Sequence, residues 1–341
     1  MNRKNCMAAL SAILAAVFYA INIPASKILL DSIEPVMMAA ILYLGAGIGV
    51  GIIYITRKNR ETAQNSSLNR SDLPYVLGMI LLDIAAPVCL MCGLRATTAA
   101  NASLLNNFEI AATAVIALAV FKEAVSARLW SGIALITVSS MILSFEDMSS
   151  LQFSWGSLLV LLAAVCWGFE NNCTRKISSK NTYQIVMLKG IFSGTGSLVI
   201  ALATGESLPD IGAVLIALML GFVSYGLSIF FYIRAQSRLG AAKTSAYYAV
   251  APFVGAFLSF VCLHEALSAN YITALVIMLA GSTLVAIDTI IVNHTHMHTH
   301  IVTHTHDGST HTHIIEHSHS HKHMIDGRVH EHTHSEETAA H

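Results

Sequence analysis

The chain has 341 residues, of which 55% are hydrophobic and only 11% are charged, and its mean hydropathy is +0.62. Soluble domains carry about 25% charged residues, so this composition excludes an ordinary soluble globular protein and makes lipid the expected solvent. The formal net charge of −1 lacks the broad basic field of a nucleic-acid-binding protein, so no nucleic-acid partner is expected.

Ten apolar segments are each long enough to cross the hydrocarbon layer, which takes about 20 helical residues. Because lipid offers the backbone no hydrogen-bond partners, these segments are predicted to be helices rather than open strands. The first segment begins like a signal peptide but continues through Asn22 and Pro24 without a cleavage site, so we expect it to be retained. In chain order, the predicted spans are residues 7–29, 35–56, 73–94, 98–121, 127–145, 153–174, 183–203, 210–233, 243–263 and 270–292.

The loops between these spans alternate in charge. Lysine and arginine gather around residues 3–4, 57–70, 122–128, 175–180 and 234–243. The intervening loops carry mainly acidic residues, with Arg95 as the clear exception. Because basic loops stay on the cytoplasmic side, ten spans predict a multi-pass protein of the cell membrane with both termini in the cytoplasm.

Two parts of the chain repeat. Residues 15–22 read Ala-Ala-Val-Phe-Tyr-Ala-Ile-Asn, and residues 163–170 read Ala-Ala-Val-Cys-Trp-Gly-Phe-Glu. Residues 121–126 match residues 263–268 in the same way, and each of these two segments lies between the last two spans of its half. Since each half has five spans and five is odd, the second half enters the membrane from the opposite side, which predicts an inverted repeat.

The repeated motifs are similar to those of a known family. They are the aromatic first helix of each half, the Lys122-Glu123 and His264-Glu265 motifs, and residues 241–246 before an apolar run with Pro252. Together they resemble the drug/metabolite transporter superfamily, and specifically its EamA-like ten-helix exporters, over about residues 7–292. We expect Lys122-Glu123 and His264-Glu265 to be cap and anchor elements, and Pro252 to kink its helix.

The resemblance implies an all-α integral membrane protein with ten transmembrane helices. Its two inverted five-helix repeats are expected at residues 1–148 and 149–293, followed by a disordered tail at 294–341. In that family the two bundles surround a central cavity that opens alternately to each side. The sequence also lacks the G-x-x-x-x-G-K-[ST] phosphate loop of an ATP-driven motor. Relatives often carry an arginine in the second helix near Leu42 or Tyr43, and Lys189 is the candidate equivalent in the seventh.

Few charged residues lie inside the predicted spans, where a charge at the bilayer centre costs about 2.5 to 3.5 kcal/mol. Glu170 shares a helical face with Trp167, and the counterpart in the first span is a face with Tyr19 and Asn22. These faces are expected to meet near the pseudo-twofold axis, where repeat-built transporters place their substrate. The alternative is a clamp of hydrogen bonds between helices.

A stripe in the fourth span contains Asn106 and Glu109, with Asn107 beside it. Glu109 is a candidate carrier of a coupling proton. Lys189 is a candidate neighbour of that proton site or a binder of a substrate carboxylate. The alternative is a Lys189 ion pair with Glu170 or Glu109 that only holds the bundles together.

Three further residues complete the candidate site. Asp83 lies four residues before Pro87, where a bend can expose a carbonyl to water. Tyr225 and Tyr248 are expected to line the cavity or, alternatively, to anchor the membrane interface. The predicted substrate-binding or coupling residues are therefore Tyr19, Asn22, Asp83, Asn106, Asn107, Glu109, Trp167, Glu170, Lys189, Tyr225 and Tyr248.

The C-terminal tail holds sixteen of the seventeen histidines, with His264 as the exception. Their spacing by two places them on one side of an extended chain, and neutral imidazole binds Zn²⁺, Ni²⁺, Co²⁺ or Cu²⁺. We therefore expect several exchangeable metal sites of modest affinity on a disordered segment, although no cofactor is required. The predicted ligands are His294, His296, His298, His300, His304, His306, His311, His313, His317, His319, His321 and His323.

The leading functional hypothesis is a secondary exporter of amino acids or related small metabolites that works by alternating access, with a metal-responsive tail. No nucleophile, base and orienting residue form a recognisable set, so an enzyme is not expected. One alternative is a divalent-metal or metal-chelate transporter in which the tail delivers the cargo. Another is a membrane metal sensor that transports nothing. Coupling to a proton or another ion and assembly into a homodimer stay open.

Overall fold

The molecule consists of two units. Contacts between Cα atoms divide the chain into Met1–Ile287 and Asp288–His341. The computed structural model describes residues 3–61, 68–121, 126–147, 152–177, 180–235, 247–265, 268–306 and 309–324.

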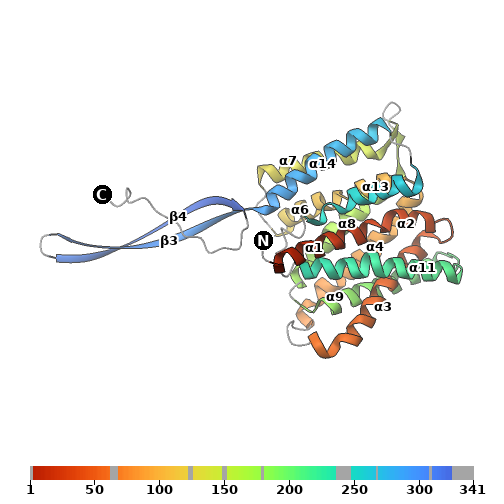
Figure 1. Ribbon diagram of the computed structural model, residues 1–341, viewed down its shortest axis with the longest axis horizontal. Helices are drawn as coiled ribbons and strands as arrows, with labels where there is room; N and C mark the ends of the chain where they lie inside the picture. The colour runs from red at the N-terminus through yellow and green to blue at the C-terminus, as the bar shows by residue number, and fades with distance from the viewer. Residues whose placement is uncertain are drawn as a thin grey trace. The chain divides into compact units, whose positions relative to one another are not determined.

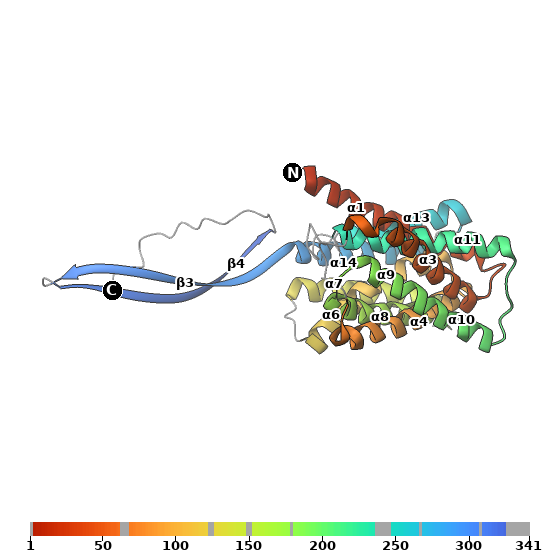
Figure 2. The ribbon, with the colours of Figure 1, turned by 90° about the horizontal axis from the view of Figure 1, so that it is seen from below.

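The first unit is a bundle of apolar helices that run side by side (Figures 1 and 2). Among its described residues, eight helical stretches are long and apolar enough to cross a membrane. The all-α multi-pass architecture predicted from the sequence is therefore confirmed. The helical elements are α1 (Arg3–Ala20), α2 (Asn22–Leu29), α3 (Pro35–Glu61), η1 (Arg70–Asp72), α4 (Leu73–Arg95), α5 (Ala99–Leu105), α6 (Phe108–Phe121), α7 (Ala127–Ser144), α8 (Trp155–Ile177), α9 (Thr182–Leu188), η2 (Lys189–Ser193), α10 (Gly194–Ala203), α11 (Ile211–Gly221), η3 (Phe222–Leu227), α13 (Ala251–Leu263) and α14 (Ala269–Ile290).

The other two predicted spans are not single long helices. Span 98–121 is divided into α5 and α6 by a turn at Asn106 and Asn107. In span 243–263, a turn at residues 249–250 precedes α13, so Pro252 lies in the first turn of a helix. The span is therefore interrupted directly before Pro252 rather than bent within one continuous helix, and the kink expected there stays a prediction. A proline fits there because its missing N–H would have no partner within the helix anyway.

Polar residues coincide with irregular turns in three other spans. The first span breaks at Ile21, directly before Asn22. The seventh contains the π-helical segment η2, which starts at Lys189, and the eighth contains the π-helical segment η3, which includes Tyr225. Single π-helical turns inside α-helices are frequent at functional sites. The irregular turns therefore mark several of the residues selected from the sequence.

Glycines let α3 approach the seventh and eighth spans closely, and Figures 1 and 2 show α3 beside α9 and α11. A Cβ atom on Gly190 would overlap the backbone of Gly47, and one on Gly221 would overlap the backbone of Leu42. Membrane helices associate through small residues because lipid is as apolar as their side chains. This packing fixes a first-repeat helix between two second-repeat helices.

Two glutamates from connecting segments cap helices far away in the sequence. The Glu206 carboxylate accepts hydrogen bonds from the first amides of α3, with an O–N distance of 2.6 Å to Met37. Glu265 accepts from Ala99 and Ala100 of α5 at 2.7 and 2.9 Å, in line with the helix dipole. The expected cap role of Glu265 is confirmed, whereas Glu123 lies outside the described residues.

Strands are few in the described residues. In the first unit, β1 (Phe145–Asp147) pairs with β2 (Gln152–Phe153) between α7 and α8. In the second unit, β3 (Ile291–His306) pairs antiparallel with β4 (Ser309–Met324) (Figure 1). A lone two-stranded ribbon is marginally stable in water, so it differs little in free energy from an unfolded segment. The disorder expected for residues 294–341 stays a prediction.

Candidate functional site

One lysine bridges two carboxylates in the interior of the bundle. Lys189 Nζ lies 2.8 Å from Glu170 Oε1 and 3.2 Å from Asp83 Oδ2. The side chains of Lys189, Glu170 and Asp83 are 8%, 3% and 0% exposed. Buried charges persist only when they are paired. These three residues, from the seventh, sixth and third spans, form what we call the charged triad.

A tyrosine that sequence reasoning did not select holds one member of the charged triad. The Tyr43 hydroxyl donates to Asp83 Oδ1 at 2.9 Å, and it accepts from the indole N–H of Trp167 at 3.5 Å. Tyr43 is only 2% exposed. The signal for Tyr43 in the sequence was a hydroxyl inside an apolar span. It lies near the position where members of the family that the sequence resembles often carry an arginine.

Aromatic rings join the first span to the charged triad. The rings of Tyr43 and Tyr225 are 5.0 Å apart, and Tyr19 lies 5.9 Å from both Tyr225 and Tyr248. Asn22 donates to the Tyr225 hydroxyl at 3.0 Å. We call Tyr19, Tyr43, Tyr225 and Tyr248 the tyrosine cluster. The polar faces of the first and sixth spans, which were expected to meet, are linked through this cluster.

The repeat seen in the sequence is visible in the hydrogen bonds. Ser26 donates to Asn22 Oδ1 at 3.1 Å, four residues earlier in the first span. Thr174 donates to Glu170 Oε1, also four residues earlier, in the sixth span. The same local bond therefore orients a neutral amide in one repeat and a carboxylate in the other.

Glu109 lies in the first turn of α6 with a neutral partner. Its Oε1 accepts from Asn171 Nδ2 at 2.6 Å, and Asn171 also lies 3.4 Å from the Thr113 hydroxyl. Of the two ion pairs considered for Lys189, the one with Glu170 is present in the structure, together with one to Asp83. Glu109 is thus a second carboxylate site beside the charged triad.

The break between α5 and α6 carries buried polar atoms. Asn106 donates to the Tyr19 hydroxyl at 2.8 Å, but its Oδ1 has no hydrogen-bond partner among the described residues. Asn107 is 0% exposed, and both its side-chain polar atoms lack such a partner. Most buried polar groups are hydrogen-bonded, so the break offers donors and acceptors that no described residue uses.

The predicted metal ligands lie in the second unit. The strand register pairs His294 with His321, and His296 with His319. Within each strand the predicted ligands recur at intervals of two or four residues. Among residues whose side chains the structure describes, no group of three or more His, Cys, Asp or Glu is placed to hold a metal ion.

Comparisons with known proteins agree on a transporter. The sequence pattern of the EamA-like transporter family matches residues 7–145 and 154–287. An uncharacterized transporter of Methanothermobacter thermautotrophicus is 28% identical over 80% of this chain and 84% of the relative. The uncharacterized transporter YyaM of Bacillus subtilis is 24% identical over 63% of this chain and 73% of the relative.

A solved crystal structure has the same fold. It superposes with a TM-score of 0.61 at 14% sequence identity, covering 83% of this chain and 97% of the other. The two segments that match the family agree with the repeat derived from the sequence.

Proposed function

The chain belongs to the EamA-like transporter family, whose members are membrane transporters and not enzymes, and from this premise we propose that it exports amino acids or other small organic metabolites. The proposed route is alternating access in the cell membrane, by rocking of the two repeats around the charged triad. Both termini face the cytoplasm in this proposal, in keeping with the basic loops.

The charge of the triad is the observation that carries the proposal. With all three groups ionised, Asp83 and Glu170 outnumber Lys189 by one negative charge. An unneutralised charge away from water is costly, so the site favours one further positive charge. A proton and the ammonium group of an amino acid are both suitable. Competition between them for one site would exchange an outgoing solute for an incoming proton.

The surroundings of the charged triad favour an organic solute. The tyrosine cluster and Trp167 provide aromatic faces and hydroxyls beside the charges, and aromatic faces attract organic cations. Lys189 occupies the position between the carboxylates that a divalent cation would take. The bundle therefore suits a metal route less well than a metabolite route.

The irregular turns supply a structural basis for movement. The breaks at Ile21 and Asn106–Asn107 and the π-helical segments at Lys189 and Tyr225 all lie in or beside the proposed site. Discontinuous helices form the binding sites of many repeat-built transporters, and hinge positions absorb backbone changes during closure. Rocking about these turns would change the water access of the charged triad.

We also propose that the histidine tail binds a divalent transition metal and regulates transport. The histidine-rich strand register is the observation that favours this second role. In the alternative, the tail delivers metal as cargo to the bundle. Flux measurements with and without residues 294–341 separate the two, because loss of metal response alone favours regulation and loss of metal flux favours delivery.

Vesicles containing the purified protein test the proposed function. They are loaded with labelled amino acids in turn, and efflux is followed with and without acid outside. We expect faster efflux of at least one amino acid than from protein-free vesicles, and acceleration by external acid. The double variant Glu109→Gln with Glu170→Gln should stop this acceleration, whereas Glu34→Gln, which changes an acid bonded to Ser207, should not.

Two results would count against the proposal. Unchanged fluxes in the double variant would show that the site is misassigned. Flux of divalent metal with no amino-acid flux would favour the metal transporter.

A further inference from the structure

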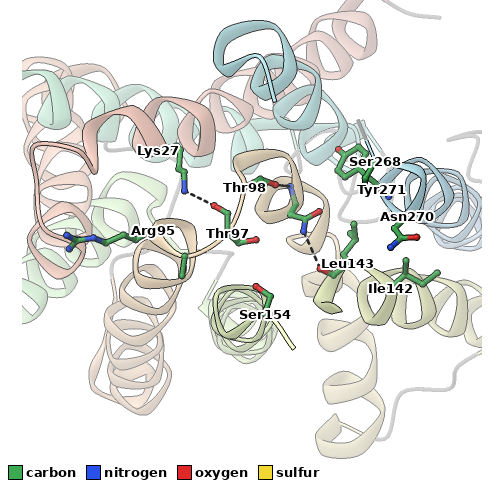
Figure 3. A pocket seen from close by; sticks show the side chains of 12 residues that line it. Lys27, Arg95, Thr97, Thr98, Ile142, Leu143, Ser154, Ser268, Asn270 and Tyr271 are labelled. Carbon is green, nitrogen blue, oxygen red and sulfur yellow. Dashed lines mark hydrogen bonds between the residues drawn. The ribbon is translucent and has the colours of Figure 1, made fainter. Parts of the chain in front are cut away.

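A cavity of about 560 Å³ lies where several helices begin or end, and no member of the charged triad lines it (Figure 3). The ends of α2, α4 and α7 and the starts of α5 and α14 line it. Arg95 at its wall is twelve residues beyond Asp83 in α4, which is about 18 Å of helix. The volume falls within the range of about 300 to 1,000 Å³ typical of small-molecule sites.

The described lining of this cavity is polar and its charged side chains are basic, while the Glu265 carboxylate outside the lining acts electrostatically on both Lys27 and Tyr271. Nine of its twelve lining residues have polar or charged side chains, and the two charged ones are Lys27 and Arg95. Figure 3 shows Lys27 directed toward Thr97, whereas Arg95 extends away from the other side chains. Lys27 is therefore the positive charge that a ligand inside would meet.

Among the described residues, Lys27 has two hydrogen-bond acceptors and therefore retains capacity for a ligand. Its Nζ donates to the backbone oxygens of Leu94 and Thr97, both at 2.6 Å, and an ammonium group has a third N–H. Asp31 and Glu265 interact electrostatically with Lys27 but do not line the cavity, and the Glu265 carboxylate is held by two amides of α5. An anionic oxygen is the acceptor that best suits the third N–H.

Tyr271 provides a second, independent indication of a ligand on the other side of the cavity. It is 5% exposed, and its hydroxyl has no hydrogen-bond partner among the described residues. Its ring packs edge-on against Phe260 at 5.0 Å, and its N–H donates to Ser268 Oγ at 3.0 Å. A hydroxyl fixed in place without a partner is unusual in a buried position.

We propose that this cavity binds a small organic carboxylate that carries a second hydrogen-bonding group away from its charge. The carboxylate bonds to Lys27, and the distant group bonds to the Tyr271 hydroxyl. Figure 3 shows these two residues on different sides of the lining, so a ligand with two separated polar groups suits the cavity better than a bare inorganic anion. The site is separate from the charged triad, and its occupation does not depend on transport.

Protection of a cysteine introduced at Asn270 tests the proposal. Asn270 is exposed and lines the cavity, and its labelling by a maleimide is followed by mass spectrometry of its peptide. The exposed native Cys262 lies outside the cavity lining and serves as the control in the same sample. We expect millimolar 4-hydroxybutyrate or glutamine to slow labelling at position 270, and butyrate, which lacks the second group, to slow it much less.

Two variants assign the protection to the cavity. Lys27→Met should weaken the apparent affinity by about 10- to 100-fold, as loss of a charged hydrogen bond implies. Tyr271→Phe should weaken it by about 2- to 10-fold and leave folding unchanged, because the hydroxyl has no described partner. Tyr75→Phe, at a half-exposed tyrosine of α4, is the matched control. Tyr271→Phe keeps the test decisive where Lys27→Met does not fold.

Protection that survives Tyr271→Phe but disappears with Asp83→Asn would place the ligand at the charged triad and overturn the proposal. Protection by inorganic phosphate alone would also overturn it. Slow labelling in vesicles with phosphatidylglycerol, but not with phosphatidylcholine alone, would show a lipid headgroup instead of a soluble carboxylate. Failure of this test leaves the efflux test of the proposed function untouched.

Discussion

The first and sixth spans have equivalent local structure but different chemistry. In both, a hydroxyl bonds to the polar residue four positions earlier, but that residue is neutral Asn22 in the first repeat and charged Glu170 in the second. Asn22 contacts the tyrosine cluster through Tyr225, whereas Glu170 contacts Lys189. A symmetric scaffold therefore carries an asymmetric site, with aromatic and amide groups on one side and charge on the other.

The largest expected loss of folding stability comes from removing Lys189, the cation that the second repeat supplies to the charged triad. Lys189→Met leaves the Asp83 and Glu170 carboxylates buried without a positive partner, and breaking a buried pair costs about 3 to 5 kcal/mol of folding free energy. The measurement is the temperature at which protein purified in detergent loses its gel-filtration peak. Lys180→Met is the control, since its pair with Asp72 is more exposed than the charged triad and its loss should cost less.

The triple variant with Lys189→Met, Asp83→Asn and Glu170→Gln sharpens this result. It should recover most of the lost stability, because no unpaired charge remains in the triad. A Lys189→Met protein as stable as the wild type would contradict the account of the charged triad.

The next largest loss of stability is expected at the close contact between α3 and the second repeat. Gly47→Ala would push a methyl group into the backbone of Ile191 and Gly190, and overpacking costs about 1 to 3 kcal/mol. Gly51→Ala lies one turn further along α3 and meets only the Met187 side chain, 3.7 Å away. Thermal unfolding should separate the two variants, with Gly51→Ala close to wild type. Equal stabilities would mean that α3 packs less closely than described.

A smaller difference in stability is expected between two variants that each remove one of the local hydrogen bonds. Ser26→Ala removes a bond to a neutral amide and should cost about 0.5 to 1.5 kcal/mol. Thr174→Val removes a bond to the Glu170 carboxylate and should cost about 1.5 to 3 kcal/mol. Unfolding curves recorded under the same conditions give the difference between the variants. A larger loss with Ser26→Ala would reverse the assignment of neutral and charged sides.

The smallest effect on the bundle is expected from removing the tail. Deletion of residues 294–341 should leave the unfolding temperature and amino-acid efflux nearly unchanged without metal, because that segment is outside the bundle unit. Titration calorimetry with Zn²⁺ should lose its binding signal in the deleted protein. Full Zn²⁺ binding after the deletion would place the metal sites in the bundle.

Part of this description was accessible from the sequence. The helical membrane architecture followed from apolar length, and the repeat followed from matching segments such as 15–22 and 163–170. The Lys189–Glu170 pair was foreseen as one of two options. Apolar periodicity shows which face of a helix is polar but not which helix packs against it, so the position of Asp83 in the triad could not be derived.

Other features arise from tertiary packing. A tyrosine in an apolar span also suits a membrane interface, so the hydroxyl of Tyr43 alone does not distinguish a site residue from an interface anchor. The break at Asn106–Asn107 and the π-helical turn at Lys189 interrupt segments that are continuous in hydropathy. Such turns are set by neighbouring helices rather than by local propensity, so a single sequence contains little signal for them.

Proton release on solute binding tests the central claim most directly. The amino acid identified by the efflux screen is added to purified protein in weakly buffered detergent solution, and a pH indicator records the protons released. If a proton and the cationic solute compete for the charged triad, the wild type should release close to one proton per bound solute, and Glu170→Gln should release far less. Solute binding to the wild type without proton release would contradict the claim.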